Sequence, residues 1–499
     1  MAFASIIFIF CFFPCSLLLY SLLKKESARN FLLIILAMLF YAWGKPEYVI
    51  LLLMSVLVNY WIAVFIARMQ KAQKNAVIGI VICMIYNIGI LWVFKYLNFT
   101  IAGINTLLHT DVKAMQLVMP AGISFFTFKA ISYCLDVYYQ TVEAEKNLWN
   151  VALYISYFPQ IMSGPIQTYH SFLPNIRERN RSVEMIGKGI RRFLLGLGKK
   201  VLIADNLAPM VTDIFSRDSG TVSIMLAWIG AVSWLIQLFF DFSGYSDMAL
   251  GVGMAFGFEC EENFNYPYIS KSIGEYYRRW HISLGNWFNE YLYMPIFRKL
   301  LEKKSPFAKR NVTVLEGDVV ALIIVWTFTG LWHGDHITYI VWGFYYATFI
   351  IIERFIKRHK KKKRNAKKLN QNQISFCINI RKHIITMLIV IIGQVIFRSD
   401  NMHRAYQYIF SMFGGGSGKL VSSDAFYYLR TNWVYLLPGI LFCFPVAPYI
   451  RTAVEKSNKV KLQELTELVV IPFCYIIMFL ISVSYLLTSA TQTFLYFNF

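Results

Sequence analysis

A histidine in an apolar stretch is the side chain of this sequence best suited to chemistry. His333 follows the run Trp326-Thr-Phe-Thr-Gly-Leu-Trp, and a second apolar run extends from Ile337 to Ile352. An ionisable residue at membrane depth indicates a functional site. Burial keeps an imidazole neutral, which is the form that accepts a proton from a hydroxyl at pH 7. We therefore interpret His333 as a general base that activates an alcohol toward an acyl thioester. A proton relay and a helix–helix hydrogen bond remain open as alternatives.

Two further polar side chains lie at helical spacing from this histidine. On a continuous helix Thr329, His333 and His336 share one face, so we expect them to line one cavity. A closed zinc site would need two ligands beyond the two histidines. Neither a His-Glu-x-x-His motif nor a cysteine pair accompanies them. We therefore expect no metal at this position.

A second histidine, His281, stands in the stretch Glu275-Tyr-Tyr-Arg-Arg-Trp-His-Ile-Ser-Leu. Arg278 and Arg279, followed by Trp280, are typical of a helix at a membrane interface. Guanidinium groups there can bind the phosphates of a lipid head group or of a nucleotide-bearing donor. Two structural alternatives remain open, namely arginines that reach the interface without a ligand and a hydrogen-bonded imidazole at His281. With Trp332 and Thr329, these two arginines and Trp280 are our candidate substrate-binding residues.

The chain ends on an aromatic tail, Phe494-Leu-Tyr-Phe-Asn-Phe. Composition alone favours an aromatic anchor at the outer membrane interface. A terminal tyrosine can also thread back into a cavity, and Tyr496 would then present its phenol to His333.

The composition places these residues in a membrane protein. Of the 499 residues 57% are hydrophobic and only 15% are charged, and apolar runs of spanning length recur from end to end. The net charge of +21 does not indicate nucleic-acid binding, because the basic residues cluster in short loops between the runs. The sequence therefore predicts an all-α polytopic membrane protein with about 11–13 membrane segments, some of them re-entrant.

The apolar runs also predict particular elements. We expect spans at Val222–Phe240, Met248–Phe258 and Val319–Ile352, and a re-entrant or interfacial region from Asp241 to Pro295. The basic segment 354–368 is predicted to be a flexible cytoplasmic loop. Residues 383–397 then run outward, the stretch 400–432 forms an outer loop, and the tail 488–499 lies outside the membrane.

Several motifs in order along the chain resemble those of a known family. They are Tyr41-Ala-Trp-Gly-Lys-Pro-Glu-Tyr, Pro120-Ala-Gly-Ile-Ser-Phe-Phe-Thr-Phe, Tyr157-Phe-Pro-Gln-Ile-Met-Ser-Gly-Pro, Asp241-Phe-Ser-Gly-Tyr-Ser-Asp-Met-Ala, Glu262-Asn-Phe-Asn-Tyr-Pro-Tyr, Arg278-Arg-Trp-His-Ile-Ser-Leu and Leu331-Trp-His-Gly. Phe397-Arg and Met412-Phe-Gly extend the likeness into the C-terminal half. Together they resemble the membrane-bound O-acyltransferase (MBOAT) family in its bacterial alginate O-acetylation branch.

The resemblance implies a fold and an activity. It implies a single integral membrane domain over residues 1–499, built as a helical bundle around a central funnel, in a bacterial cytoplasmic membrane. The implied reaction moves an acyl group, most simply acetyl from acetyl-CoA, across the membrane to O-acetylate an exported or cell-surface polysaccharide. Acetyl-CoA or another acyl thioester acts as a donor substrate, and no bound cofactor is implied. The implied partner is an extracytoplasmic transferase of SGNH-hydrolase type, which reaches the polysaccharide; membrane lipid surrounds the chain.

The resemblance also assigns roles to residues. The family's histidines correspond to His333 and His281, and the tail resembles a terminus thought to carry the acyl group, which makes Tyr496 the relay. Alternatives within the class are D-alanyl transfer to teichoic acid and O-acetylation of peptidoglycan. A proton-coupled transporter or flippase, with the two histidines as proton relays, is the alternative from a different class, and a lysolipid acyltransferase is a third.

Overall fold

The computed structural model describes residues 1–499 except for 180–181, 303–312, 365–373, 458–459 and 489–499. All regular secondary structure in the described residues is helical. The predicted all-α class is thereby confirmed. The chain divides into two compact units, and helix α12 (Ile224–Ala255) contributes to both.

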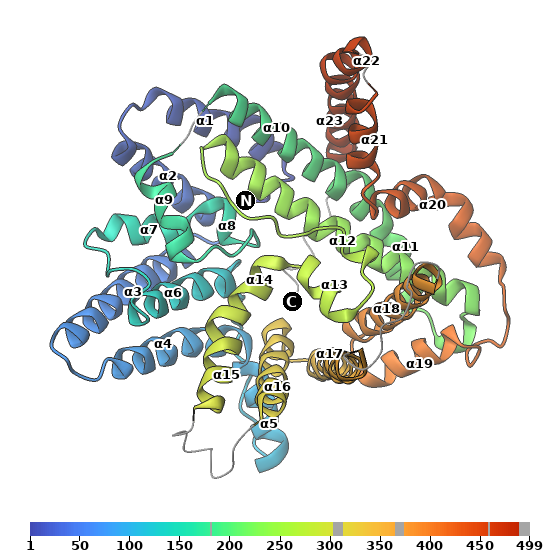
Figure 1. The fold of residues 1–499 in the computed structure, drawn as a ribbon, viewed down its shortest axis with the longest axis horizontal. Helices are drawn as coiled ribbons and strands as arrows, with labels where there is room; N and C mark the ends of the chain where they lie inside the picture. The colour runs from blue at the N-terminus through green and yellow to red at the C-terminus, as the bar shows by residue number, and fades with distance from the viewer. Residues whose placement is uncertain (180–181, 303–312, 365–373, 458–459, 489–499) are drawn as a thin grey trace. The chain divides into compact units, whose positions relative to one another are not determined.

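The first unit comprises residues 1–198, 244–261 and the described end of the chain from residue 478. Its helices are η1 (Phe8–Phe12), α1 (Phe13–Leu22), α2 (Glu26–Ala42), α3 (Tyr48–Lys71), α4 (Val77–Lys95), α5 (Leu97–Leu108), α6 (Ile123–Tyr138), α7 (Leu148–Ser156), α8 (Phe158–Ile161), α9 (Tyr169–Arg177) and α10 (Val183–Gly198). Helices α3, α4 and α6 pack side by side (Figure 1). Across the contact of α3 with α4, the buried amides of Asn59 and Asn87 bond to each other, with Asn87 Nδ2 2.7 Å from Asn59 Oδ1. Such interhelical amide pairs hold apolar membrane helices together.

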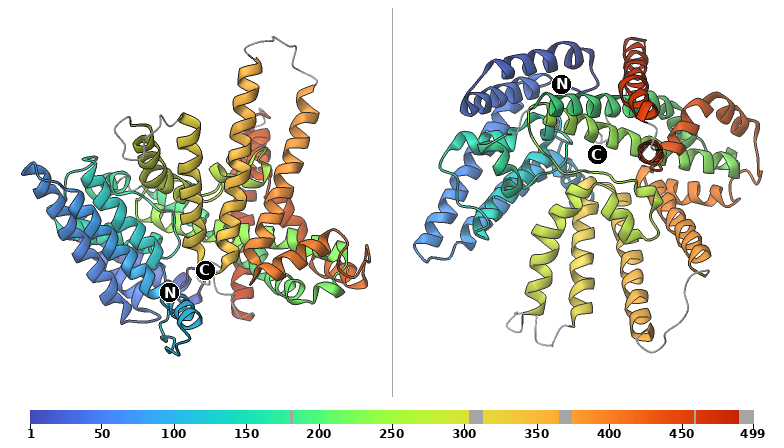
Figure 2. Two further views of the ribbon diagram at one scale, coloured as in Figure 1. Left: turned by 90° about the horizontal axis from the view of Figure 1, so that it is seen from below. Right: turned by 45° about the horizontal axis from the view of Figure 1, so that its top comes forward.

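The second unit comprises residues 199–243 and 262–477. Its helices are η2 (Lys199–Ala204), α11 (Asp205–Ser216), η3 (Ser219–Thr221), η4 (Pro267–Ile269), α13 (Ile273–Arg279), α14 (Ile282–Phe288), η5 (Asn289–Tyr293), α15 (Met294–Leu301), α16 (Val314–His333), α17 (Ile337–Arg364), α18 (Ile374–Arg398), α19 (Met402–Met412), α20 (Ser423–Phe442), α21 (Val446–Glu455), α22 (Val460–Leu465), η6 (Thr466–Val470) and α23 (Ile471–Thr488), whose last turns belong to the first unit. Helices α17 and α18 lie side by side (Figure 2).

Seven helices among the described residues are long and apolar enough to cross a membrane, and an eighth span is formed if the bent pair α20–α21 counts as one. They are α3, α4, α12, α16, α17, α18 and the stretch Gln463–Thr488. The expectation of about 11–13 segments also counted runs that form shorter helices, such as α2 and α7. A run of apolar residues that is too short to span can still be a core helix of the bundle.

Three sequence-based expectations about elements were wrong. The two spans predicted at 222–240 and 248–258 are one continuous helix, α12, so residues 241–255 belong to a spanning helix. The rest of the predicted re-entrant region forms the short helices η4, α13, α14 and η5, which are not among the spanning helices. The single span predicted at 319–352 is two helices, α16 and α17, which break after His333. The segment 354–364 is the end of α17 and not a flexible loop, while residues 365–368 lie outside the described part.

Small residues bring α16 and α17 into close contact. A Cβ atom added at Gly330 would lie 2.6 Å from the carbonyl oxygen of Tyr339, and one added at Gly343 would lie 2.5 Å from that of Trp326. Only glycine leaves room for backbones this close, which is the usual way in which membrane helices approach each other. The tight hairpin fixes where α16 ends and therefore where His333 stands.

A buried ion cluster secures the start of α11 against α12 within the second unit. Lys200 Nζ lies 2.5 Å from Asp205 Oδ1 and 2.6 Å from Asp241 Oδ1, and both Lys200 and Asp241 are buried. Burial of charged groups is tolerated only where opposite charges contact each other closely, as they do here.

Candidate active site

The imidazole of His281 is positioned by a turn between two short helices. His281 links α13 to α14 and adopts a left-handed backbone conformation, with φ 45° and ψ 56°. This conformation costs a residue with a side chain about 1–3 kcal/mol and is concentrated at functional sites. Residues 263–265 run alongside this turn, because the Ile282 amide donates to the Asn263 carbonyl at 2.9 Å and the Asn265 amide donates to the Arg279 carbonyl at 2.9 Å.

The side chain of Asn263 fixes the proton on His281. Asn263 Oδ1 accepts from the backbone N–H of Ser283 at 3.2 Å and from its hydroxyl at 2.9 Å, and it lies 3.1 Å from His281 Nδ1. A backbone N–H can only donate, so the atom that it meets is the amide oxygen, and His281 Nδ1 must donate to it as well. The neutral imidazole therefore carries its proton on Nδ1 and leaves Nε2 unprotonated.

Burial keeps this imidazole neutral. His281 is buried, its ring meets the Phe242 ring edge-on at 4.7 Å, and α13 and α14 are not among the spanning helices. Loss of hydration lowers the pKa of His281 to about 3, since the charged form is the one that water stabilises most. His281 is thus an unprotonated base over the whole neutral range.

The two arginines before His281 lie at the surface of the second unit. Arg279 donates from Nε to Glu275 Oε1 at 3.1 Å and from Nη1 to the carbonyl oxygen of Asn265 at 3.0 Å. Arg278 is exposed. The structure therefore uses Arg279 to hold the turn that carries His281, whereas Arg278 makes no ion pair with any residue in the described ranges. Phosphate binding by these residues remains an expectation.

The start of α13 is anchored by α17. Glu353 of α17 accepts hydrogen bonds from the backbone amides of Ile273 at 2.5 Å and Gly274 at 3.2 Å, which are the first two residues of α13. A carboxylate at a helix N-terminus satisfies donors that have no partner within the helix and interacts favourably with the helix dipole. This contact sets the position of the short helix that leads to His281.

The rings of Trp280 and Trp332 have different surroundings. Trp280 is buried, stacks on Tyr276 at 5.7 Å and meets Phe264 edge-on at 5.2 Å, so it belongs to the aromatic core. Trp332 is half-buried, and its ring centroid lies 6.2 Å from that of His281 and 4.6 Å from that of His333. Trp332 therefore forms a wall that the two imidazoles share, and substrate binding by it stays a prediction.

His333 is the last residue of α16 and lies in an aromatic cage. It is buried, and its ring packs edge-on against Trp342 at 5.0 Å and Phe397 at 4.9 Å. Tyr339 closes the cage at 6.1 Å. The neighbours come from α17 and α18, so three spanning helices enclose this imidazole in apolar surface.

His336 does not join Thr329 and His333 on the helix face where we expected all three to line one cavity. The helix ends at His333, so His336 lies beyond the break, where it is exposed and Nδ1 donates to the carbonyl oxygen of Asp400 at 3.1 Å. Thr329 is buried, and its hydroxyl donates back to the Val325 carbonyl of its own helix at 2.8 Å. The prediction was wrong because it assumed one uninterrupted helix. Tyr496 lies outside the described residues.

Sequence reasoning missed two contributors to the site. Asn263 is completely buried, and it stands 18 positions before His281 in a short polar stretch. The sequence feature that could have indicated its role is an amide side chain within a loop motif, because a buried amide needs hydrogen-bond partners. Phe397 packs against His333 but is separated from it by 64 positions, and nothing local in the sequence indicates that contact.

The fold and the site define a multi-pass helical membrane protein with two buried imidazoles close to one tryptophan. A model of the membrane-bound O-acyltransferase (MBOAT) family matches residues 145–393. The chain belongs to this family and is an acyltransferase, as the motifs predicted.

The names of similar proteins specify different polymers. The chain is 36% identical to the probable alginate O-acetylase AlgI of Pseudomonas aeruginosa over 428 residues, which is 84% of this chain and 76% of the relative. It is 29% identical to a peptidoglycan O-acetyltransferase of Helicobacter pylori over 477 residues, covering 88% of this chain and 85% of the relative. It is 26% identical to a teichoic acid D-alanyltransferase of Bacillus subtilis over 392 residues, covering 76% of this chain and 92% of the relative.

Proposed function

We propose that this enzyme takes an acetyl group from acetyl-CoA at the cytoplasmic face and delivers it across the membrane for O-acetylation of an exported polysaccharide. The observation that carries the proposal is the pair of buried imidazoles that share Trp332 as a wall. The names of the relatives support the polymer acceptor, and those with the higher identities are O-acetylases.

The proposed chemistry begins with a proton transfer to His333. The imidazole accepts the phenol proton of Tyr496, and the phenolate oxygen attacks the thioester carbonyl carbon. The carbon–sulfur bond breaks, the imidazolium returns the proton to the thiolate, and a phenyl ester and free CoA thiol result. A phenol has an ordinary pKa of about 10, so it needs a positioned base near neutral pH.

The second half of the reaction passes the acyl group outward. A serine or sugar hydroxyl of the acceptor side attacks the ester, and Tyr496 regains its proton. His281 suits a further proton-transfer step, because Asn263 and burial leave its Nε2 unprotonated. We propose an SGNH-hydrolase-like partner as the acceptor-side transferase.

The proposed orientation follows from the charge of the helix ends. Helix α17 begins next to the His333 cage and ends in the run Arg354 to Arg364, which contains six more lysines or arginines between these two. Basic segments stay on the cytoplasmic side. The end of α16 and the start of α17 would then face outward, and the tail after residue 488 would lie outside a bacterial cytoplasmic membrane.

Intact-mass measurement of the purified protein after exposure to acetyl-CoA tests this proposal. We expect a gain of one acetyl group that maps to the C-terminal peptide, and no gain in His333→Ala or Tyr496→Phe. His403→Ala is the matched control, because His403 is an exposed histidine on α19 of the same unit. Undiminished acetylation of the His333→Ala protein would refute the assignment of the base. A D-alanyl thioester offered in parallel distinguishes the teichoic acid chemistry, and substrate flux without a covalent product would indicate a transporter.

A further inference from the structure

Two hydrogen-bond donors on α17 are buried without an acceptor. Thr338 is completely buried, and Trp342 is only 4% exposed. Neither the hydroxyl of Thr338 nor the indole N–H of Trp342 meets a hydrogen-bond partner in the part of the chain that the structure describes. A buried polar group in this state destabilises the fold, so its presence needs an explanation.

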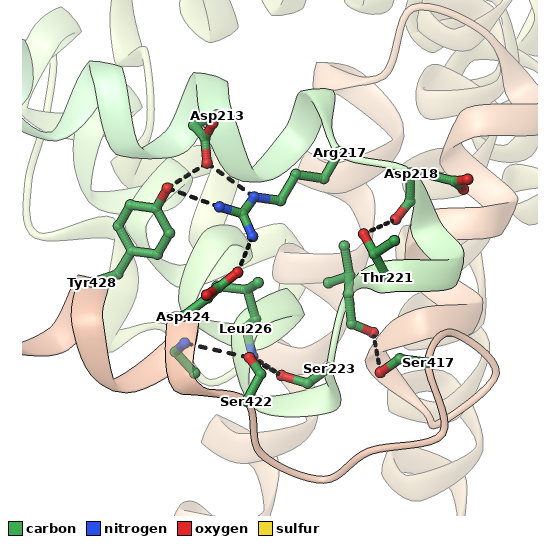
Figure 3. A network of polar contacts seen from close by, with 12 residues as sticks. Asp213, Arg217, Asp218, Thr221, Ser223, Leu226, Ser417, Ser422, Asp424 and Tyr428 are labelled. Carbon is green, nitrogen blue, oxygen red and sulfur yellow. Dashed lines mark hydrogen bonds and ion pairs between the residues drawn. The ribbon is translucent and has the colours of Figure 1, made fainter.

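The polar side chains between α11 and α20 show the usual arrangement in the same unit. Arg217 contacts Asp424 and donates from Nε to Asp213 at 3.0 Å, while Tyr428 contacts both Asp213 and Arg217 (Figure 3). Each of these four side chains therefore has partners that account for it. Thr338 and Trp342 differ from this arrangement.

The place of Thr338 in its helix explains why its hydroxyl has no partner there. Thr327 on α16 and Thr348 on α17 each donate to the backbone carbonyl four positions earlier, at 2.8 Å. Thr338 is the second residue of α17, so the residue four positions before it is Gly334, which lies outside the helix. Its hydroxyl is therefore available to a group that the helix itself does not supply.

The face of α17 that carries both donors borders the imidazole of His333. Thr338 and Trp342 are four positions apart, so they share one face of the helix. The Trp342 ring meets the His333 ring edge-on at 5.0 Å and packs against Phe397 at 5.3 Å. Thr338 belongs to the first turn of α17, where the helix dipole is positive. Two donors and a positive helix end beside an imidazole suit a negatively charged oxygen.

We propose that Thr338 and Trp342 donate hydrogen bonds to the oxyanion that forms when the acyl thioester is attacked beside His333. The inference rests on the proposed function and adds two catalytic residues to its first step. The attacking oxygen bonds to the carbonyl carbon, and the electron pair of the carbonyl double bond moves onto the carbonyl oxygen. The carbonyl then re-forms as the carbon–sulfur bond breaks, and the thiolate takes the proton held by His333. Donors placed where this negative charge develops lower the barrier.

The missing partners are what such a pair of donors requires. A donor already bonded within the protein would have to give up that bond before it could bind the oxyanion. Donors held in place without one need no rearrangement at the moment of reaction. The indole of Trp342 is held by aromatic neighbours, since its ring packs against Tyr346 at 5.3 Å and Trp326 at 5.9 Å.

The rate of transfer and the stability of variants of the full-length protein test the proposal together. Thr338→Val and Trp342→Phe each remove one donor. We expect each to lower the rate of transfer from labelled acetyl-CoA to the protein by about 100-fold or more. The acetyl-CoA concentration that gives the half-maximal rate should not change, because the oxyanion exists only during the reaction. The melting temperature of Thr338→Val should stay the same or rise, because a methyl group replaces an unpaired buried hydroxyl.

Three further variants serve as controls. Thr338→Ser keeps the hydroxyl and should keep most of the rate. Thr348→Val and Trp433→Phe make the matching changes at exposed residues of α17 and α20, and both should transfer acetyl at the wild-type rate. The Thr338 variants suffice for the test if Trp342→Phe does not fold.

Two results would overturn the inference alone. Equal transfer rates of the Thr338→Val and Thr348→Val proteins would show that the hydroxyl takes no part in the reaction. A slow Thr338→Val protein with a clearly lowered melting temperature would assign the hydroxyl to the fold. A wild-type protein that takes no acetyl group from acetyl-CoA would instead refute the proposed function and the inference with it.

Discussion

Removal of the Asn263 side-chain amide should damage acyl transfer more than it damages the fold as a whole. Asn263→Ala takes away the single oxygen that receives His281 Nδ1 and both donors of Ser283. The imidazole then loses the bond that selects its tautomer and is able to place its proton on Nε2 instead. A catalytic group in the wrong tautomer cannot accept a proton where the substrate lies.

The size of the effect follows from the three bonds. The Ser283 hydroxyl can rotate toward another acceptor and the imidazole can move its proton to Nε2, but the backbone N–H of Ser283 is fixed and buried. At about 1–3 kcal/mol for a stranded buried donor, the variant loses about 1–3 kcal/mol of stability. Removal of the hydrogen-bond partner that orients a metal-bound histidine typically lowers activity by about 10–100-fold, and we expect the same range for the acyl-transfer rate here.

The assay combines the rate of transfer from labelled acetyl-CoA with thermal unfolding in detergent, and the rate is measured well below the melting temperature of each variant. Ser283→Ala is the control, because it removes one donor and leaves the bond between His281 and Asn263 in place. It should lose about 0.5–1.5 kcal/mol of stability and keep most of the rate. A folded Asn263→Ala protein with the wild-type rate would refute the tautomer argument.

Three further predictions concern stability. Gly330→Ala should cost about 1–3 kcal/mol, because the added Cβ meets the Tyr339 carbonyl at 2.6 Å, and thermal unfolding measures the loss. Burial holds the pKa of His281 at about 3 in the folded protein, against about 6.5 in the unfolded chain. The contribution of this pKa difference to the free energy of unfolding is therefore complete above pH 6.5 and falls by about 1.4 kcal/mol per pH unit as the pH drops toward 3. Measured as a function of pH, the free energy of unfolding of His281→Gln should fall less steeply in acid than that of the wild type. Lys200→Met removes the cation that buried Asp241 and half-buried Asp205 contact and should cost about 3–5 kcal/mol in denaturant unfolding, part of which Asp205→Asn restores.

Each of these predictions has its own control or contrary outcome. Gly187→Ala on α10, where an added Cβ meets nothing within 4 Å, should be neutral or stabilising, and an equal loss there would contradict the close-contact argument. Parallel pH curves for the wild-type and His281→Gln proteins would mean that folding does not lower the pKa of His281. A double variant at Lys200 and Asp205 no more stable than Lys200→Met alone would show that repulsion between the carboxylates is not the cause.

The class of the fold could be predicted from composition, but its helix boundaries could not. Apolar residues run from Val319 to Ile352 with little interruption, so periodicity alone predicts one long helix. The break after His333 is set by tertiary packing, since the chain must turn there to bring Gly330 and Gly343 against the facing backbone. The short polar stretch Gly334-Asp-His was the only local indication that a helix ends there. The direction in which the chain continues depends on how α17 packs against α16.

The two histidines of the site were predictable because imidazoles are rare in apolar surroundings. Their surroundings were not, since Asn263 and Phe397 reach them through contacts between distant segments. The left-handed turn at His281 was equally hidden, because glycine is the residue that ordinarily marks that conformation and none stands there. Residue chemistry therefore identified the groups, and tertiary contacts determine their tautomer and their neighbours.

The hydrogen bonds between Glu353 and the start of α13 connect helix α17 to both imidazoles of the second unit. Near its first turns α17 supplies Tyr339 and Trp342 to the His333 cage, and farther along it holds the helix that leads into His281. Helix α17 therefore helps to position both His281 and His333. A tilt of α17 would move the two imidazoles together, so the distance between them would stay the same. Their distance from a substrate bound between other helices would change.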